Sequence, residues 1–330
     1  MSLIFDMRDA ALRRAGIAAA AAALHRGELV GMPTETVYGL AADAANPDAV
    51  AAIFLAKGRP RFNPLIVHVG SLAEAQSLAI LSPDAVRLAG AFWPGPLTLV
   101  VRRRAAAPVA DLVTAGLDTI AVRAPRHSVA QELLAAFGGP IAAPSANLSG
   151  HVSATTAAHV AADLGGKLSC ILDAGPTELG LESSIVDTTG DEPKLLRSGA
   201  LARASIEAEL GRPLALAHDD GSSPRAPGML TSHYAPAARL RLNAAEVYPQ
   251  EALLALGQRL PPGAGDASAI RNLSPSGDLT EAGKNFFAAL RDLDGKAAVI
   301  AVMSIPNSGL GEAINDRLNR AAAPRAGMTE

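Results

Sequence analysis

The sequence has little of several residue types on which common protein classes depend. Its 330 residues include one cysteine, one tryptophan and 3% aromatic residues in total. A single cysteine, Cys170, excludes a disulfide within the chain and a cluster of thiolate metal ligands. It lies in the apolar run "LSCILDAG", which predicts a buried structural thiol. The low aromatic content disfavours a surface that stacks on the bases of single-stranded RNA.

A large excess of one charge is also absent. The 29 basic and 32 acidic residues give a formal net charge of -3, so any basic site must be local. Arg13 and Arg14 before an alanine-rich stretch imitate an export signal. The alternative is a first helix that ends near Gly27, followed by a strand in "LVGMPT". The uncharged stretch from Ala15 to Leu24 is too short to span a bilayer.

Length and a hydrophobic content of 49% predict two packed domains. From residue 9 to about residue 210, helical and strand patterns alternate, which is typical of an α/β domain around a mostly covered sheet. Asn46 with Pro47, and Ser82 with Pro83, are typical of an N-cap followed by proline in the first helical turn. The expected strands are "PLIVHV", "LTLVV", "TIAVRAP", "PIAAPSAN", "LSCILDAG" and "SSIVDTT", with helices near 127–137 and 155–164.

The pattern breaks at about residue 211, where a stretch rich in Gly, Pro and Ser predicts an interdomain linker. After the linker a smaller βα unit is expected. Its elements are a strand in "ARLRLN", helices near 248–259 and 280–293, a strand in "AAVIAVM" and a final helix.

Several common catalytic motifs do not occur. The chain has no phosphate-binding loop of the type G-x-x-x-x-G-K-[ST], and "SGLGEAI" is interpreted as a turn into a helix. Its seven histidines form no H-E-x-x-H pair, and no carboxylate cluster has the spacing of a metal loop. The serines of "PSANLSG" lack a nucleophile elbow. A transition-metal centre and a serine nucleophile are therefore disfavoured.

Polar clusters instead stand at strand ends and in loops. They are "PTETVYGL", "KGRPRFNPLIVHV", "TIAVRAP", "PSANLSG", "ESSIVD" and "LLRSG". Taken singly, Lys57 is explained as a solvated helix end, Arg59 and Arg61 as an exposed loop, and His68 as a satisfied strand residue. In an open α/β sheet, however, such loops converge on one crevice, so their coincidence predicts a site for an anionic ligand.

These clusters carry a family resemblance. "PTETVYGL", Lys57-Gly58-Arg59, "NPLIVHV" and Ser145-Ala146-Asn147 resemble the K-x-R and S-x-N signature of the YrdC-like threonylcarbamoyl-adenylate synthases. The similarity covers about residues 8–205, and "RAPGMLTSHYAP" with the C-terminal part resembles the longer branch of that family. The resemblance implies a YrdC-like open twisted sheet domain (8–205), a linker and active-site lid (206–238) and a Rossmann-like C-terminal α/β domain (239–330).

The resemblance implies a nucleotidyltransferase that makes L-threonylcarbamoyl-AMP from L-threonine, bicarbonate and ATP and releases pyrophosphate. The product would supply a tRNA threonylcarbamoyl transferase complex that modifies the adenosine beside the anticodon. The triphosphate of ATP, the carboxylate of threonine and bicarbonate are all anionic, so the site needs Arg, Lys and the Mg²⁺ that ATP brings, and positioning dominates the chemistry. A cytoplasmic protein without membrane contact is expected, and weak contact with tRNA is left open.

The implied site residues fall into two groups. Those for ATP are Lys57, Arg59, Asn63, Thr119, Ser145, Asn147, Ser153, Arg197 and Tyr234. Those for threonine are Thr36, His68, Arg123, the main chain at Ala143, and Ser183. Lys57 and Arg59 would stabilise charge during the reaction, and no protein ligand for a metal is implied. Tyr234 lies in the linker, which implies that the linker folds over the site as a lid.

Two rival functions are weighed against this one. An RNA-binding module would use the basic face of the same domain, and a carbamoyl transferase would share the fold but carry further segments that this chain lacks. The role of the second domain stays open between supporting the lid and docking the transferase that consumes the product.

Overall fold

The computed structural model describes residues 2–216, 226–228 and 232–324. It divides into an N-terminal unit (Met1–Ser149, Ala154–Glu178 and Glu182–Met229) and a C-terminal unit (Gly150–Ser153, Leu179–Leu181 and Leu230–Glu330). Two short loops from the first part of the sequence thus belong to the C-terminal unit. The three predicted segments with boundaries at 205 and 238 stay a prediction, and the linker residues 217–225 and 229–231 lie outside the described residues.

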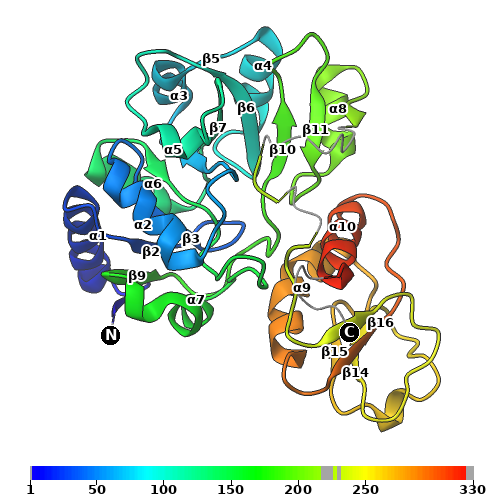
Figure 1. The fold of residues 1–330 in the computed structure, drawn as a ribbon. Coiled ribbons are helices and arrows are strands. Elements are labelled where there is room, and N and C mark those ends of the chain that lie inside the picture. The colour runs from blue at the N-terminus through cyan, green and yellow to red at the C-terminus, as the bar shows by residue number, and fades with distance from the viewer. Residues whose placement is uncertain (1, 217–225, 229–231, 325–330) are drawn as a thin grey trace. The chain divides into compact units, whose positions relative to one another are not determined.

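The N-terminal unit is built on one mixed sheet (Figure 1). Its elements are β1 (Leu3–Asp6), α1 (Ala10–His25), β2 (Val30–Met32), β3 (Gly39–Asp43), α2 (Pro47–Lys57), β4 (Ile66–His68), α3 (Leu72–Leu78), β5 (Ala79–Ile80), α4 (Pro83–Phe92), β6 (Leu97–Arg103), α5 (Asp111–Thr114), β7 (Thr119–Arg123), α6 (Ser128–Phe137), β8 (Ile141–Ala142), α7 (Ala157–Leu164), the 3-10 turn η1 (Gly165–Lys167), β9 (Cys170–Asp173), β10 (Ser184–Asp187), β11 (Lys194–Arg197), α8 (Arg203–Leu210) and β12 (Ala215–Leu216). The strand order is β1-β9-β2-β3-β8-β4-β7-β6-β10-β11-β12, with β5 paired to β6.

Local sequence signals set the ends of the first helices. The side chain of Asp9 accepts hydrogen bonds from the N–H groups of Ala11 and Leu12, which starts α1 in the alanine-rich stretch. Asn46 does the same for α2, with Pro47 in the first turn as predicted. Gly58 ends α2 with a φ of 61°, a left-handed conformation that glycine adopts without steric cost. The helix interpretation of the alanine-rich segment is therefore confirmed. In the described part of the chain, no helix is both long enough and apolar enough to cross a membrane.

Helices cover both faces of the sheet. On β3 the side chains alternate between two cores: Ala41 belongs to one, and Leu40 and Ala42 to the other. The first core joins α1 and α6 to the sheet, and these two helices lie beside each other in Figure 1. The second core includes residues from α2, α4 and α7. This two-sided packing confirms the predicted α/β class, and Cys170 is buried in the first core as expected.

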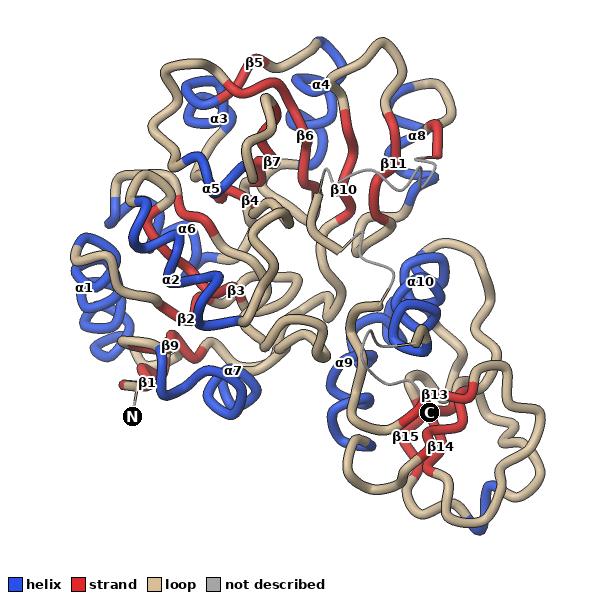
Figure 2. The backbone as a smooth tube through the Cα atoms, in the orientation of Figure 1, coloured by secondary structure: helices blue, strands red, loops and turns tan. Residues whose placement is uncertain are grey.

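The C-terminal unit contains a smaller, fully parallel sheet (Figure 2). Its elements are β13 (Arg239–Arg241), β14 (Ala252–Ala255), the 3-10 turn η2 (Ala264–Asp266), β15 (Ile270–Asn272), α9 (Leu279–Leu293), β16 (Val299–Val302) and α10 (Leu310–Ala322). The strand order is β13-β16-β14-β15, and α9 and α10 contact each other and the sheet. The expected Rossmann-like α/β fold is confirmed, as is the turn into a helix at "SGLGEAI", where Gly309 precedes α10.

The helix predicted near 248–259 is wrong, because this segment contains strand β14. All four residues of β14 are buried between β16 and β15. A strand in the middle of a parallel sheet is apolar on both faces, so it lacks the alternation that distinguishes strands from buried helices. A continuous apolar run such as "ALLALG" therefore fits either structure.

Candidate functional site

Three neighbouring strands bring three of the predicted threonine-binding residues together, His68, Arg123 and Ala143. His68 at the end of β4 is in register with Arg123 at the end of β7 and with Ile141 of β8. Side chains in register on parallel strands point to the same face of the sheet. The N–H of Ala143 donates to the carbonyl of Ile66 over 3.0 Å, which fixes the chain after β8 against β4.

Arg123 is the centre of a buried polar network. Its Nη2 lies 2.7 Å from Oε1 of Glu35, its Nη1 donates to Oγ1 of Thr36 over 2.8 Å, and its Nε donates to the carbonyl of Gly95 over 3.1 Å. Arg123 is 3% exposed and Glu35 1% exposed. Burial alone would raise the pKa of Glu35, but the Arg123 guanidinium and the N–H of Arg126 outweigh it and hold the pKa below its usual value. Glu35 is therefore ionised at neutral pH.

His68 is neutral in this environment. Burial, and then the positive charge of Arg123, lower the pKa of His68 to about 3. Its Nδ1 is enclosed and has no hydrogen-bond partner among the described residues. A neutral imidazole offers one donor and one acceptor, so this ring suits a hydroxyl group better than an anion.

Ser183 and Arg197 meet at the start of β10 and the end of β11. Nη2 of Arg197 donates to the carbonyl of Ser183 over 2.8 Å and to its Oγ over 3.2 Å. The hydroxyls of Ser183 and Thr98 lie 2.7 Å apart. Gly199 makes this packing possible, since a Cβ there would lie 2.4 Å from the carbonyl oxygen of Glu182. One predicted threonine residue and one predicted ATP residue are thus neighbours.

The described part of the linker returns to the sheet of the N-terminal unit. Ala226 is fully buried in an apolar cluster with Ile66, Ala121 and Ile185. The carbonyl of Pro227 accepts a hydrogen bond from Nη1 of Arg197 over 3.2 Å. These contacts attach residues 226 and 227 to the N-terminal unit next to Arg197. The role of the linker as a lid stays a prediction.

The K-x-R and S-x-N motifs are joined by the side chain of Lys57. Its Nζ donates to the carbonyl of Ser145 over 2.6 Å and also to the carbonyl of Asn147. The N–H of Ser149 donates in turn to the carbonyl of Lys57 over 2.9 Å. Burial, followed by repulsion from Arg59, lowers the pKa of Lys57 well below its ordinary value. Lys57 thus holds the S-x-N loop in place, and its contact with phosphate stays a prediction.

The loop after α2 presents a buried amide. Nε of Arg59 donates to the carbonyl of Asn63 over 3.2 Å, and its Nη2 donates to the carbonyl of Pro64 over 2.8 Å. Asn63 is 1% exposed, and neither Oδ1 nor Nδ2 has a hydrogen-bond partner among the described residues. A buried polar group without a partner costs about 1–3 kcal/mol. A ligand that both accepts and donates a hydrogen bond would remove this cost.

The remaining predicted ATP residues belong to other elements of the chain. Thr119 is buried at the start of β7, whereas Ser153 and Tyr234 belong to the C-terminal unit. Arg291 of α9 donates to the carbonyls of Val152 and Ser153, at 2.5 Å and 3.2 Å.

Tyr234 is packed inside the C-terminal unit. Its ring is 1% exposed, lies 5.7 Å from the ring of Phe287 by centroids, and has the guanidinium of Arg317 5.2 Å from its centroid. The predicted nucleotide contact of Tyr234 stays a prediction.

Sequence reasoning assigned no role to Glu35, Thr98 or Gly199, although Glu35 and Gly199 lie within two of the polar clusters. Glu35 lies within "PTETVYGL", and its signal was a carboxylate next to a predicted ligand residue, Thr36. Thr98 carried no signal, because it stands in the apolar strand "LTLVV".

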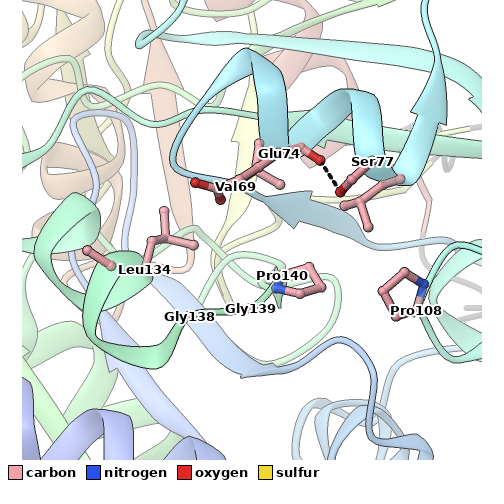
Figure 3. A pocket seen from close by; sticks show the side chains of 10 residues that line it. Val69, Glu74, Ser77, Pro108, Leu134, Gly138, Gly139 and Pro140 are labelled. Atoms are coloured by element: carbon pink, nitrogen blue, oxygen red, sulfur yellow. Dashed lines mark hydrogen bonds between the residues drawn. The ribbon is translucent and has the colours of Figure 1, made fainter.

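A hollow of about 430 Å³ beside α3 and the end of α6 is separate from these clusters. Figure 3 shows Glu74 and Ser77 of α3 on one side and Gly138, Gly139 and Pro140 on the other. None of the predicted site residues lines it. Glu74 already accepts hydrogen bonds from the N–H of Gly70 and the hydroxyl of Ser71. Among the residues that the structure describes, no lysine or arginine lines the hollow, so it offers no fixed positive charge for an anionic ligand.

Metal binding by the protein alone finds no support in the described residues. They contain no group of three or more His, Cys, Asp or Glu side chains that could hold a metal ion. A Mg²⁺ ion that arrives on ATP needs few protein ligands, because phosphate oxygens and water supply most of its coordination. The site's chemistry is thus compatible with Mg²⁺ bound through the nucleotide.

The geometry defines a class of protein: an α/β protein with buried basic side chains at the ends of β7, β11 and α2. Residues 22–199 match the family model for Sua5/YciO/YrdC proteins, described as "Telomere recombination". Residues 201–323 match that for the C-terminal domain of threonylcarbamoyl-AMP synthase.

Individual relatives span nearly the whole chain. The threonylcarbamoyl-AMP synthases of Bacillus subtilis and Pyrococcus abyssi are each 40% identical to it, over 94% and 98% of this chain and 93% and 99% of theirs. The crystal structure of Pyrococcus abyssi Sua5 complexed with L-threonine has a TM-score of 0.87 at 36% identity, covering 98% of this chain and 97% of that one. This chain belongs to the threonylcarbamoyl-AMP synthase family, in its two-domain branch.

Proposed function

We propose that this enzyme synthesises L-threonylcarbamoyl-AMP from L-threonine, bicarbonate and ATP and releases pyrophosphate. The observations that carry the proposal are the joining of the K-x-R and S-x-N motifs by Nζ of Lys57 and the buried network of Arg123. The two relatives that are 40% identical over nearly the whole chain are both named threonylcarbamoyl-AMP synthase.

In the proposed reaction the amine of threonine attacks the carbon of bicarbonate and forms an N-carboxy intermediate, with loss of water. The new carboxylate then attacks the α-phosphorus of ATP, and pyrophosphate leaves. Fixed guanidinium groups stabilise the negative charges that these steps bring together. Arg59, Asn63 and Arg197 would bind the nucleotide, and Arg123, Thr36, His68 and Ser183 would bind threonine. Mg²⁺ bound to ATP would supply further charge neutralisation on the phosphates.

This reaction would make the enzyme a nucleotidyltransferase of tRNA modification, and we propose that it acts in the cytoplasm. Its product is a mixed anhydride, which a tRNA threonylcarbamoyl transferase complex would consume for the adenosine beside the anticodon. We also propose that the linker shields this labile product from water, with Ser153 and Tyr234 contributing to the nucleotide site.

The test is pyrophosphate release from ATP with Mg²⁺, measured with L-threonine and bicarbonate each present or omitted. Release that needs both, and that serine supports poorly, is the expected result. Release that ignores threonine, or that carbamoyl phosphate drives, would overturn the proposal. Isothermal titration then assigns the two subsites: Arg59→Ala is expected to weaken ATP binding, and Arg123→Ala threonine binding.

A further inference from the structure

Glu35 is a buried carboxylate of which only one oxygen is used by the protein. It lies in the connection between β2 and β3 and is 1% exposed. Its Oε1 pairs with Nη2 of Arg123 at 2.7 Å and accepts from the N–H of Arg126 over 3.1 Å. Its Oε2 is enclosed and has no hydrogen-bond partner in the described part of the chain. A hydrogen-bond donor from outside the described residues would satisfy Oε2.

Charge decides which kind of group can occupy this position. Burying an ionised oxygen without a donor is costly, so the missing partner must donate a hydrogen bond. A phosphate, a bicarbonate or a carboxylate would add a negative charge against Glu35 and is excluded at this oxygen. The titratable groups that interact with Glu35 are Arg123, His68 and His127, and Arg123 is already bonded to Oε1. The partner is thus a cationic or a neutral hydrogen-bond donor.

We propose that Oε2 of Glu35 binds the α-ammonium group of the substrate amino acid. The inference rests on the proposed function, which supplies threonine as the substrate. In an amino acid the ammonium and the carboxylate are attached to the same carbon, so they lie side by side with opposite charges. The adjacent carboxylate of Glu35 and guanidinium of Arg123 present the complementary pair of charges.

This arrangement gives Glu35 a role in specificity. It selects an amino acid over the hydroxy acid of the same shape, because a hydroxyl in place of the ammonium loses the ionic part of the hydrogen bond. Thr36 and His68 stand beside Arg123 and remain available for the rest of the substrate. Glu35 therefore has two roles: it binds threonine, and it holds the side chain of Arg123 in place.

The test compares L-threonine with 2,3-dihydroxybutanoate of the same configuration, in which a hydroxyl replaces the ammonium. Isothermal titration with the full chain measures both affinities in the wild type and in Glu35→Gln. The wild type is expected to prefer threonine by about 10- to 100-fold, the effect of one hydrogen bond to a charged group. Glu35→Gln is expected to lose most of this preference. If Glu35→Gln acted only by displacing Arg123, both compounds would bind more weakly to the same extent. The ratio of their affinities would then be the same as in the wild type.

Glu178→Gln is the matched control, because Glu178 is an exposed carboxylate that pairs with Arg126 in the same unit. It is expected to keep the wild-type preference. An unchanged preference in Glu35→Gln would overturn the assignment of Glu35 and leave the proposed function intact. Should Glu35→Gln fail to fold, the wild type decides, since equal affinity for the two compounds would also overturn the assignment. A wild type that binds no threonine would overturn both proposals.

Discussion

At the scale of single residues, the site depends on charges that are buried in pairs. The pair of Arg123 and Glu35 is nearly inaccessible to water, so each side chain needs the other to remain charged. The sequence made Arg123 predictable, because an arginine at the end of an apolar strand is unusual. Its partners were not predictable, since Thr36 is 87 positions away along the chain.

The pair gives a prediction for stability. Arg123→Met leaves the carboxylate of Glu35 buried without its partner and is expected to lower the free energy of unfolding by about 3–5 kcal/mol. The double variant Arg123→Met/Glu35→Leu removes both charges and is expected to be more stable than Arg123→Met alone. Urea denaturation measures both values, with the exposed Arg126→Met as control. A double variant that is less stable than the single one would contradict a dominant role of the buried charge.

His68 gives a prediction for pH dependence. Its pKa is about 3 in the folded chain and about 6.5 in the unfolded chain, so between these values only the unfolded state takes up the proton. The free energy of unfolding is therefore expected to fall as the pH falls below about 6.5, by up to about 1.4 kcal/mol per pH unit. The lowered pKa of Glu35 acts in the same direction at more acidic pH.

The comparison with a variant isolates the histidine. In urea denaturation between pH 7 and pH 4, His68→Gln is expected to show a shallower decrease than the wild type. His151→Gln, at an exposed position, is the control and is expected to follow the wild type. Equal slopes for all three proteins would contradict a lowered pKa of His68 in the folded chain.

At the scale of elements, the sequence revealed the starts of helices but not the pairing of strands. The starts of α2 and α4 were predictable, because Asn46 and Ser82 cap their helices within three residues of sequence. The sheet order was not predictable, since it depends on pairings such as β3 with β8 and β6 with β10. The strand β14 was misassigned for the same reason: its neighbours, and not its own sequence, make it a strand.

The pair β10 and β11 gives a prediction at this scale. Gly199 packs against the backbone of residues 182–184, and an added Cβ would approach the carbon of Ser183 to 2.4 Å. Gly199→Ala is therefore expected to lower the free energy of unfolding by about 1–3 kcal/mol and to weaken threonine binding through Ser183. Gly190→Ala is the matched control, because no atom lies within 4 Å of its added Cβ. Thermal unfolding and threonine titration check both effects, and equal behaviour of the two variants would contradict the close packing.

At the scale of the whole molecule, the two-part organisation was predictable and its details were not. The change of composition after residue 211 predicted a linker, and a second α/β fold does follow it. Nothing in the sequence, however, indicated that the loops 150–153 and 179–181 belong to the C-terminal unit. Their contacts with α9 depend on side chains more than 100 residues away, such as the bond of Arg291 to the carbonyl of Ser153, at a separation of 138 positions.

That bond gives a prediction for the second unit. Arg291→Met removes the donors that hold the carbonyls of Val152 and Ser153. Since Ser153 is proposed to bind ATP, the variant is expected to weaken ATP binding several-fold and to leave threonine binding unchanged. Isothermal titration of each ligand checks this, with the exposed Arg259→Met as control. A loss of threonine affinity in Arg291→Met would instead indicate a general disturbance of the fold.

The loop at Gly180 also contacts α9, as the loop 150–153 does. A Cβ on Gly180 would lie 2.3 Å from the carbonyl oxygen of Lys284, so the loop and α9 touch through their backbones. Residues 150–153 and 179–181 leave the ribosome long before α9 is synthesised, so their contacts with α9 can form only after this helix has been made. A chain whose synthesis stops earlier lacks the guanidinium of Arg291 that holds the carbonyls of Val152 and Ser153.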